Sequence, residues 1–244
     1  MKLLPVAGAT RGMVQIEHDL VGEPLLSLVQ IGQAAAMLPE GAVEGTDWDG
    51  PGAIPSPLDS ASAQKAIENV AFCPTWLIIR HLELLDPYRQ LMFAVLEQVR
   101  HLPNYAAIEF LRPACFVFVS SAGVCVPPHV DPEHNFLLQI QGSKTVWGHR
   151  RAEGGMSLRE LRAFYADEFG FRLPTTRARE AALIRCDLEP GGGVYIPVAA
   201  PHRVTNHSPV CVSFSVTFRT AEFERRRLAY LPETPAPADR VDRS

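Results

Sequence analysis

A histidine and an aspartate two positions apart, His129 and Asp131, form the first pair in the sequence that could bind a metal ion. Alternate side chains of an extended segment point to the same side, so we expect the imidazole and the carboxylate to face one interior. A third ligand is predicted at His202, which follows a glycine-rich turn and a short apolar run ending at Pro197. Two imidazoles and one carboxylate that leave coordination positions open are typical of non-haem Fe(II) sites that activate O2. The three residues therefore predict an iron site.

Other interpretations of these residues stay open on the residue types alone. A His-X-Asp triplet is common on exposed loops, and His134 and His207 are competing candidates for a ligand. Lys144 follows the turn Gly142-Ser143 and lies among apolar neighbours, where an ammonium without an anion is unfavourable. Lys144 therefore either pairs with an anion inside the protein or lies on the outer face in water.

The elements that must position these residues change in type along the chain. Helices are predicted over 25–38, 60–70 and 87–99, with a short strand at 76–79 between the last two and an irregular, extended segment over 43–58. From residue 116 the pattern predicts short strands at 116–121, 135–141, 144–149, 182–189, 193–197, 202–206 and 210–218. A helical insertion is predicted over 157–169, where Ser157 and Glu160 form a capping box. Strands spaced in this way indicate a sandwich or a barrel.

Composition limits the compartment and the partners. Of the 244 residues, 20% are charged, the formal net charge is -4, and no long basic tract is present, which argues against a nucleic-acid partner. Five scattered cysteines without a Cys-X-X-Cys motif suit a reducing compartment. Residues 1–13 lack the apolar core of a secretion signal, and no apolar stretch approaches the roughly 20 residues of a membrane-spanning helix. A cytoplasmic protein with no membrane partner is predicted.

Taken together, the motifs resemble those of one enzyme family. His129-Val130-Asp131 is followed by Asn135 and by Gly142-Ser143-Lys144, and the distal segment 193–197 precedes His202. This arrangement, over about residues 116–220, resembles the JmjC and cupin-like branch of the Fe(II)- and 2-oxoglutarate-dependent oxygenases. The resemblance implies that His129, Asp131 and His202 bind Fe(II). It also implies that Lys144 pairs with the distal carboxylate of 2-oxoglutarate, which supplies the anion that a buried lysine needs.

The remaining cosubstrate contacts follow from the same resemblance. Asn135 corresponds to a residue that contacts the cosubstrate or the metal-bound carboxylate, and Thr217 corresponds to a polar residue near the keto-acid end. Relatives often carry a threonine three positions before the first histidine, where this sequence has Val126. Either Tyr195 or another hydroxyl replaces that threonine, or cosubstrate binding is weakened.

The architecture implied by the resemblance is mainly β with flanking helices. A double-stranded β-helix, that is, a jelly-roll, cupin-like barrel, is expected over 111–222, with a helical insertion at about 157–170. A helical N-terminal region, 1–110, is expected to pack on the barrel or to form the face of a homodimer. Residues 223–244 form a tail that is expected to be partly disordered, apart from a short helix over 222–231.

The implied activity is hydroxylation of a peptide, a protein side chain or an amino-acid-like metabolite with O2 as a second substrate. Two alternatives remain: a cupin-type metalloenzyme that does not use 2-oxoglutarate, and a non-catalytic barrel that binds a partner or a small ligand. The predicted walls of the pocket are 41–57 and 152–176. The arginines considered for an acidic substrate are Arg150, Arg151, Arg177, Arg179, Arg203 and Arg219.

Overall fold

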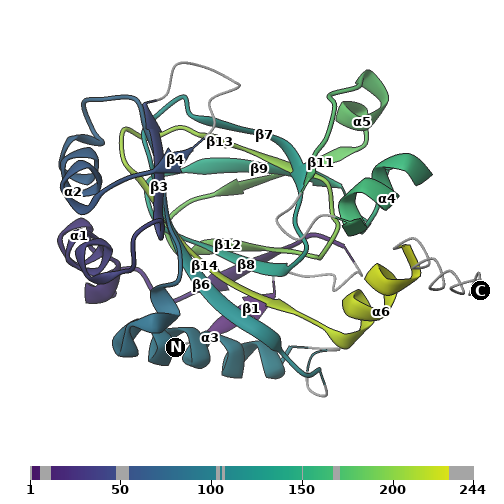
Figure 1. Cartoon of the computed structure of the whole chain (residues 1–244), viewed down its shortest axis with the longest axis horizontal. Helices are drawn as coiled ribbons and strands as arrows, with labels where there is room; N and C mark the ends of the chain where they lie inside the picture. The colour runs from purple at the N-terminus through teal and green to yellow at the C-terminus, as the bar shows by residue number, and fades with distance from the viewer. Residues whose placement is uncertain are drawn as a thin grey trace, which may run out of the picture.

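Two antiparallel sheets that face each other form the framework of the protein (Figure 1). The computed structural model describes residues 2–5, 12–47, 55–102, 105, 108–149, 151–166 and 171–230. The large sheet has the strand order β1-β2-β12-β8-β14-β6-β5-β3-β4, and the small sheet has the order β10-β7-β13-β9-β11. Neighbouring strands of the barrel come from distant parts of the chain, as in a jelly roll.

The strands of the large sheet are β1 (Leu3–Pro5), β2 (Val14–His18), β12 (Gly192–Ile196), β8 (His134–Gln141), β14 (Cys211–Arg219), β6 (Leu111–Ser120), β5 (Thr75–Ile79), β3 (Val43–Asp47) and β4 (Ser56–Pro57). Those of the small sheet are β10 (Phe171–Arg172), β7 (Cys125–Val130), β13 (His202–Asn206), β9 (Lys144–His149) and β11 (Leu183–Leu188).

Strands β8 and β14 are buried on both faces because the large sheet separates two interiors. Side chains alternate along β8: Phe136 and Leu138 belong to the main hydrophobic core, whereas Asn135 and Leu137 line a cavity between the sheets. All nine residues of β14 are buried. The sequences of β8 and β14 are therefore largely apolar, and the polar side chains that interrupt them include those that face the cavity.

Helices from the first hundred residues cover the outer face of the large sheet. These are η1 (Pro24–Leu26), α1 (Leu28–Met37), α2 (Ser60–Asn69), η2 (Leu82–Leu84) and α3 (Asp86–Arg100). Ser27 and Asp59 cap α1 and α2 through side-chain oxygens that accept the amides of Gln30 and Ser62. The buried face of α3 includes Met92 and Val95, and burying each such side chain stabilises the folded protein by roughly 1.5–3 kcal/mol. These helices therefore lie on one face of the barrel.

The later helices gather at the other end of the barrel from α1 and α2 (Figure 1). Helices α4 (Leu158–Ala166) and α5 (Arg177–Ala181) belong to the insertion between β9 and β11, and α6 (Ala221–Tyr230) follows β14. Phe164, Tyr165 and Phe223 form a separate hydrophobic cluster with Val130, and the Tyr165 and Tyr230 rings stack with centroids 4.6 Å apart. Helix α6 therefore packs on the insertion.

The prediction of a mainly β jelly-roll barrel with flanking helices is confirmed, with corrections in detail. The region before residue 111 is not only helical, because β1–β5 from this region extend the large sheet. Strand β7 was not predicted as a strand, because Pro127 and Pro128 cannot donate to a ladder. The predicted boundary at 222 falls inside α6, and the residues after Pro232 lie outside the described part. No helix in the described part of the chain is long and apolar enough to cross a membrane.

Candidate functional site

The three predicted ligands meet at one end of the small sheet. His129 lies near the end of β7, Asp131 follows that strand, and His202 begins β13, where it pairs with His129 in register. One carboxylate oxygen of Asp131, Oδ2, lies 3.7 Å from Nε2 of His129 and 3.5 Å from Nε2 of His202. A donor atom of each residue lies within 4.8 Å of the other two. Two imidazoles and one carboxylate at this spacing could hold a divalent metal ion.

Both histidine rings are oriented by backbone carbonyls. His129 Nδ1 lies 2.8 Å from the carbonyl oxygen of Pro127, and His202 Nδ1 lies 2.9 Å from that of Ala200. An Nδ1–H that donates to a carbonyl leaves the Nε2 lone pair facing the carboxylate, which is the tautomer that a metal requires. Burial, followed by the neighbouring His129, lowers the pKa of His202 to about 4, so this ring is neutral near pH 7. The ligand set therefore fits a metal.

One residue, Ala199, connects the two ligand-bearing segments through its backbone. The Ala199 amide donates to the Asp131 carbonyl oxygen at 3.0 Å, and the Ala199 carbonyl accepts the amide of Glu153 at 2.6 Å. Ala199 has a φ of 59°, in the left-handed region that is unfavourable for a residue other than glycine. This conformation joins the turn before His202, the segment after β7 and the start of the insertion.

The two competing histidines lie elsewhere. His134 points to the other face of the large sheet, where Nδ1 lies 2.8 Å from the Tyr195 hydroxyl and burial lowers the pKa of the ring to about 4. His207 is exposed, and its Nε2 lies 2.8 Å from the Thr145 hydroxyl. Neither histidine belongs to the cluster formed by His129, Asp131 and His202.

Lys144 lines the same cavity as the three predicted ligands. The cavity has a volume of about 990 Å³ and also contains Asn135 and Thr217. Lys144 is only 4% exposed, so the alternative that it lies on the outer face is wrong. Burial lowers the pKa of its ammonium from 10.5 to about 8, an effect that the nearby Cys211 partly opposes. The cavity therefore combines a possible metal centre with a buried cation that favours an anionic ligand.

Three polar side chains of the cavity, Asn135, Thr217 and Asn206, already have hydrogen-bond partners within the fold. The Ser215 hydroxyl donates to Asn135 Oδ1 at 2.5 Å, and the Thr217 hydroxyl lies 3.4 Å from the Ala114 carbonyl. Asn206, which sequence reasoning missed, pairs with Lys144 across β13 and β9 and lines the cavity. Its Nδ2 donates to the Val124 carbonyl, while its buried Oδ1 has no hydrogen-bond partner among the described residues. Only the strand register could have identified it.

Tyr195 does not take the place of the threonine that relatives carry. Along β12 alternate side chains face opposite sides, so Ile196 lines the cavity while Tyr195 belongs to the main hydrophobic core. Its ring packs against Phe136 with centroids 4.9 Å apart, and burial raises its pKa well above 10. The prediction of a cosubstrate contact by Tyr195 is therefore wrong. Val126 itself lines the cavity.

Charged residues surround the rest of the cavity. Of the arginines considered in the sequence, Arg219 is the one that lines the cavity in the described part of the chain, where its Nη2 lies 2.7 Å from the Glu133 carboxylate. Arg203 pairs with Glu180 instead, and Arg150 lies outside the described residues. The predicted wall segments contribute Gly41, Glu44, Pro55, Phe171 and Arg172. Sequence reasoning missed Arg80 and Arg112.

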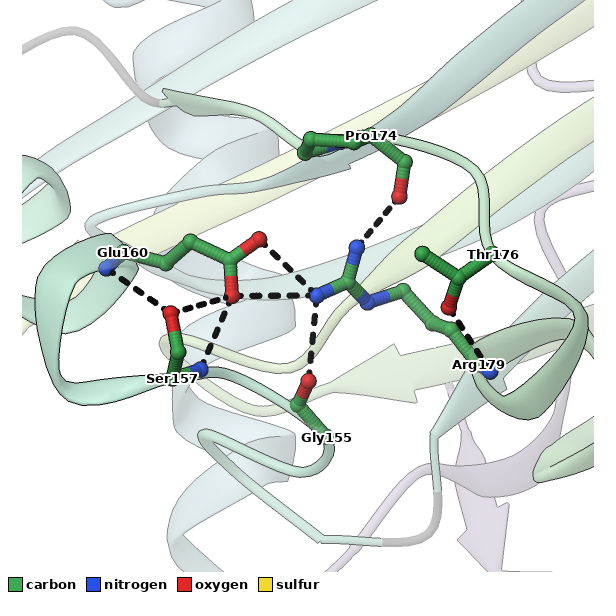
Figure 2. A network of polar contacts seen from close by, with 6 residues as sticks. All are labelled: Gly155, Ser157, Glu160, Pro174, Thr176 and Arg179. Atoms are coloured by element: carbon green, nitrogen blue, oxygen red, sulfur yellow. Dashed lines mark hydrogen bonds and ion pairs between the residues drawn. The ribbon is translucent and has the colours of Figure 1, made fainter.

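The insertion is fastened to the strand that carries His129. Strand β10 pairs with β7 so that Arg172 lies opposite His129, and the Leu173 amide donates to the Pro128 carbonyl at 2.9 Å. Figure 2 shows the network behind this pairing, in which the Arg179 guanidinium donates to the Pro174 carbonyl, to the Gly155 carbonyl and to both oxygens of Glu160. The network thus joins α4, α5 and the segment after β10.

Replacing Arg179 with glutamine is expected to lower the free energy of unfolding by about 2–3 kcal/mol. Arg179 is 6% exposed, and its loss leaves two carbonyls and the Glu160 carboxylate without their partner. Urea unfolding measures the change. Arg159→Gln, which removes an exposed guanidinium from α4, is the matched control and is expected to stay within about 0.5 kcal/mol of the original protein. Equal stability of the two variants would contradict a stabilising role for the network.

Comparisons with known proteins agree with this geometry. The family model described as "JmjC domain" matches residues 94–225, which is more than half of the chain. The fold is similar to a solved structure of YcfD from Escherichia coli with a TM-score of 0.61 and 16% identity, over 100% of this chain and 65% of that chain. Another YcfD structure, described as a ribosomal oxygenase in complex with cobalt and 2-oxoglutarate, has a TM-score of 0.51 and 18% identity, over 89% of this chain and 55% of that one.

At such identities the structural likeness shows a shared fold, and this chain spans 65% of the YcfD chain that it matches. A search of curated proteins found no match.

Proposed function

Since this chain belongs to the JmjC domain family, we propose that it is an Fe(II)- and 2-oxoglutarate-dependent oxygenase. The observation that carries the proposal is the convergence of His129, Asp131 and His202 in a cavity that also contains the buried Lys144. The buried ammonium needs an anion, and the distal carboxylate of 2-oxoglutarate supplies one, which favours this proposal over a metalloenzyme that does not use 2-oxoglutarate and over a non-catalytic barrel.

The residues of the cavity have distinct proposed roles. His129, Asp131 and His202 hold the metal, and the carbonyls of Pro127 and Ala200 keep the two rings in the required tautomer. When bound, Fe(II) and 2-oxoglutarate supply the oxidation of a substrate by O2, with succinate and CO2 as the coproducts.

Lys144 binds the distal carboxylate of the cosubstrate through a charge-assisted hydrogen bond, which is strengthened by the burial of the ammonium. Asn135 and Thr217 face the cavity from neighbouring strands, in register with each other, and are proposed to orient the other end of the cosubstrate. The buried Oδ1 of Asn206 offers an acceptor on the strand next to Lys144.

The proposed substrate is a protein side chain rather than a free metabolite. Support comes from the similar fold of YcfD, which is described as a ribosomal oxygenase. The five cysteines are free thiols in this structure, which suits the proposed location in the cytoplasm.

Succinate formation tests the proposed activity. The purified protein supplied with Fe(II), ascorbate, 2-oxoglutarate and air is expected to form succinate, and His129→Ala is expected to reduce the rate by about 100-fold or more, because two protein ligands hold the metal poorly. His207→Ala is the matched control, since His207 is an exposed histidine outside the cluster. A protein that neither binds Fe(II) nor forms succinate would refute the proposal.

A further inference from the structure

Strand β6 begins with a β-bulge at the edge of the cavity. Arg112 and Pro113 together lie opposite a single residue of β14, Phe218, because the register shifts between Thr217 and Arg219. A bulge bends its strand and redirects a side chain, and bulges are frequent beside active sites. Both bulged residues line the cavity. The irregularity therefore places Arg112 at the cavity that also contains the candidate metal centre.

The backbone at this position is strained and held in place. Arg112 has a φ of 48°, in the left-handed region, and His81, which also lines the cavity, has a φ of 60°. The carboxylate of Glu83 accepts the Cys115 amide at 3.0 Å and lies 3.3 Å from His81 Nδ1, so one side chain fixes both strained segments. Strained residues that the surrounding structure holds in place cluster at ligand-binding sites.

No residue in the described part of the chain neutralises the charge of Arg112, in contrast to Arg80 and Arg219, which also line the cavity. Arg80 pairs with Glu44 at 3.1 Å, and Arg219 pairs with Glu133 at 2.7 Å. Arg112 is exposed and makes no ion pair or hydrogen bond with any residue that the structure describes. A guanidinium presents a fork of donors that matches a carboxylate or a phosphate. Arg112 is therefore free to bind an anion at the cavity.

The cavity extends well beyond the metal centre. Its lining crosses five adjacent strands of the large sheet, from Asn135 on β8 through Thr217, Phe116 and Ile78 to Glu44 on β3. Strands lie about 4.8 Å apart, so the cavity spans about 19 Å, which matches about six residues of an extended chain. This length suits a protein segment that reaches past the oxidised residue.

We infer that Arg112 selects protein substrates with an anionic side chain, a carboxylate or a phosphorylated hydroxyl, within about four residues of the oxidised residue. The inference rests on the proposed function, because it names the substrate class of that same site. Arg112 acts as a specificity-determining residue: it binds the substrate within the cavity that contains the reacting centre.

A peptide library tests the inference. Random peptides of varied charge, with a second pool that contains phosphoserine, are incubated with the protein, Fe(II) and 2-oxoglutarate, and products that gain one oxygen atom are sequenced by mass spectrometry. Products are expected to be enriched about tenfold or more in Asp, Glu or phosphoserine at one fixed position, and Arg112→Glu is expected to shift that position to Lys or Arg. Enrichment in one pool only identifies which anion is the ligand.

Two further variants separate charge from folding. Arg112→Gly suits the positive φ, so its melting temperature is expected to be unchanged or raised while the anionic preference disappears. Arg159→Glu reverses an exposed charge on α4, outside the cavity, and is expected to keep the preference. Products without a charge preference, an unchanged preference in Arg112→Glu, or succinate formation without any oxidised peptide would each overturn the inference and leave the proposed activity standing. Absence of succinate would overturn both.

Discussion

Replacing Lys144 with methionine is expected to weaken 2-oxoglutarate binding by about 10–100-fold and, at the same time, to stabilise the folded protein. A hydrogen bond from an ammonium to a carboxylate contributes about 1.5–3 kcal/mol, which corresponds to this range of affinity. Methionine has a similar length but no charge. Calorimetric titration of the metal-loaded protein with 2-oxoglutarate measures the first effect, with Lys65→Met, on the exposed face of α2, as the matched control.

The gain in stability follows from the burial of the ammonium. A pKa of about 8 in the folded protein, against 10.5 for an exposed lysine, means that the charged form destabilises the fold by on the order of 3 kcal/mol near pH 7. Allowing for relaxation of the cavity, Lys144→Met is expected to raise the free energy of unfolding by about 1–3 kcal/mol. A variant that is less stable than the original protein would show that Lys144 has a stabilising partner inside the fold.

The same group gives a pH dependence of known sign. Between pH 8 and 10.5 the unfolded chain retains the Lys144 proton and the folded chain has released it, so stability contributed by this residue increases with pH across that window. The increase is expected to vanish in Lys144→Met. Because the cosubstrate carboxylate requires the ammonium, 2-oxoglutarate affinity is expected to fall as the pH rises above about 8.

Addition of Co²⁺ is expected to raise the melting temperature, and Asp131→Ala is expected to abolish the rise. A metal that binds only the folded state, at 100 times its dissociation constant, contributes about 2.7 kcal/mol, or roughly 5–10 °C for a protein of this size. Asp131 supplies the oxygen that lies between the two imidazoles. Thermal denaturation with and without the metal measures the shift.

The control for this experiment removes a carboxylate outside the cluster. Asp187→Ala removes a carboxylate that pairs with Arg185 and does not belong to the cluster of His129, Asp131 and His202. This variant is expected to keep the metal-dependent rise in melting temperature. A chelator is expected to reverse the shift in the original protein. An undiminished shift in Asp131→Ala would place the metal at other residues.

The sequence contained enough information to find the metal cluster but not to assign every face. Because His129 and Asp131 are two positions apart on an extended segment, their side chains point to the same side. The glycine-rich turn and apolar run before His202 place that residue on a strand, so all three ligands could be predicted without coordinates. Tyr195 was misassigned because its face depends on a one-residue register that the sequence pattern does not specify. In contrast, the residue types alone left open whether Lys144 is buried, and only the family resemblance placed it beside the cosubstrate.

Residues that depend on strand pairing escaped prediction. Asn206 faces the cavity because β13 pairs with β9, and Arg112 does so because two residues of β6 share one partner on β14. Neither pairing leaves a local pattern. Strand β7 was missed for a different reason: its two prolines suppress the usual signal of a strand, although their carbonyls still serve the His129 ring and the insertion.

The conformation of Ala199 limits which amino acids can occupy that position. Its positive φ is unfavourable for any side chain by roughly 1 kcal/mol, and its methyl group is buried in the cluster that contains Val130 and Phe164. A larger residue would meet both penalties, while glycine would remove the first and leave only a small void. Position 199, which does not belong to the candidate metal centre, is therefore expected to accept only alanine or glycine.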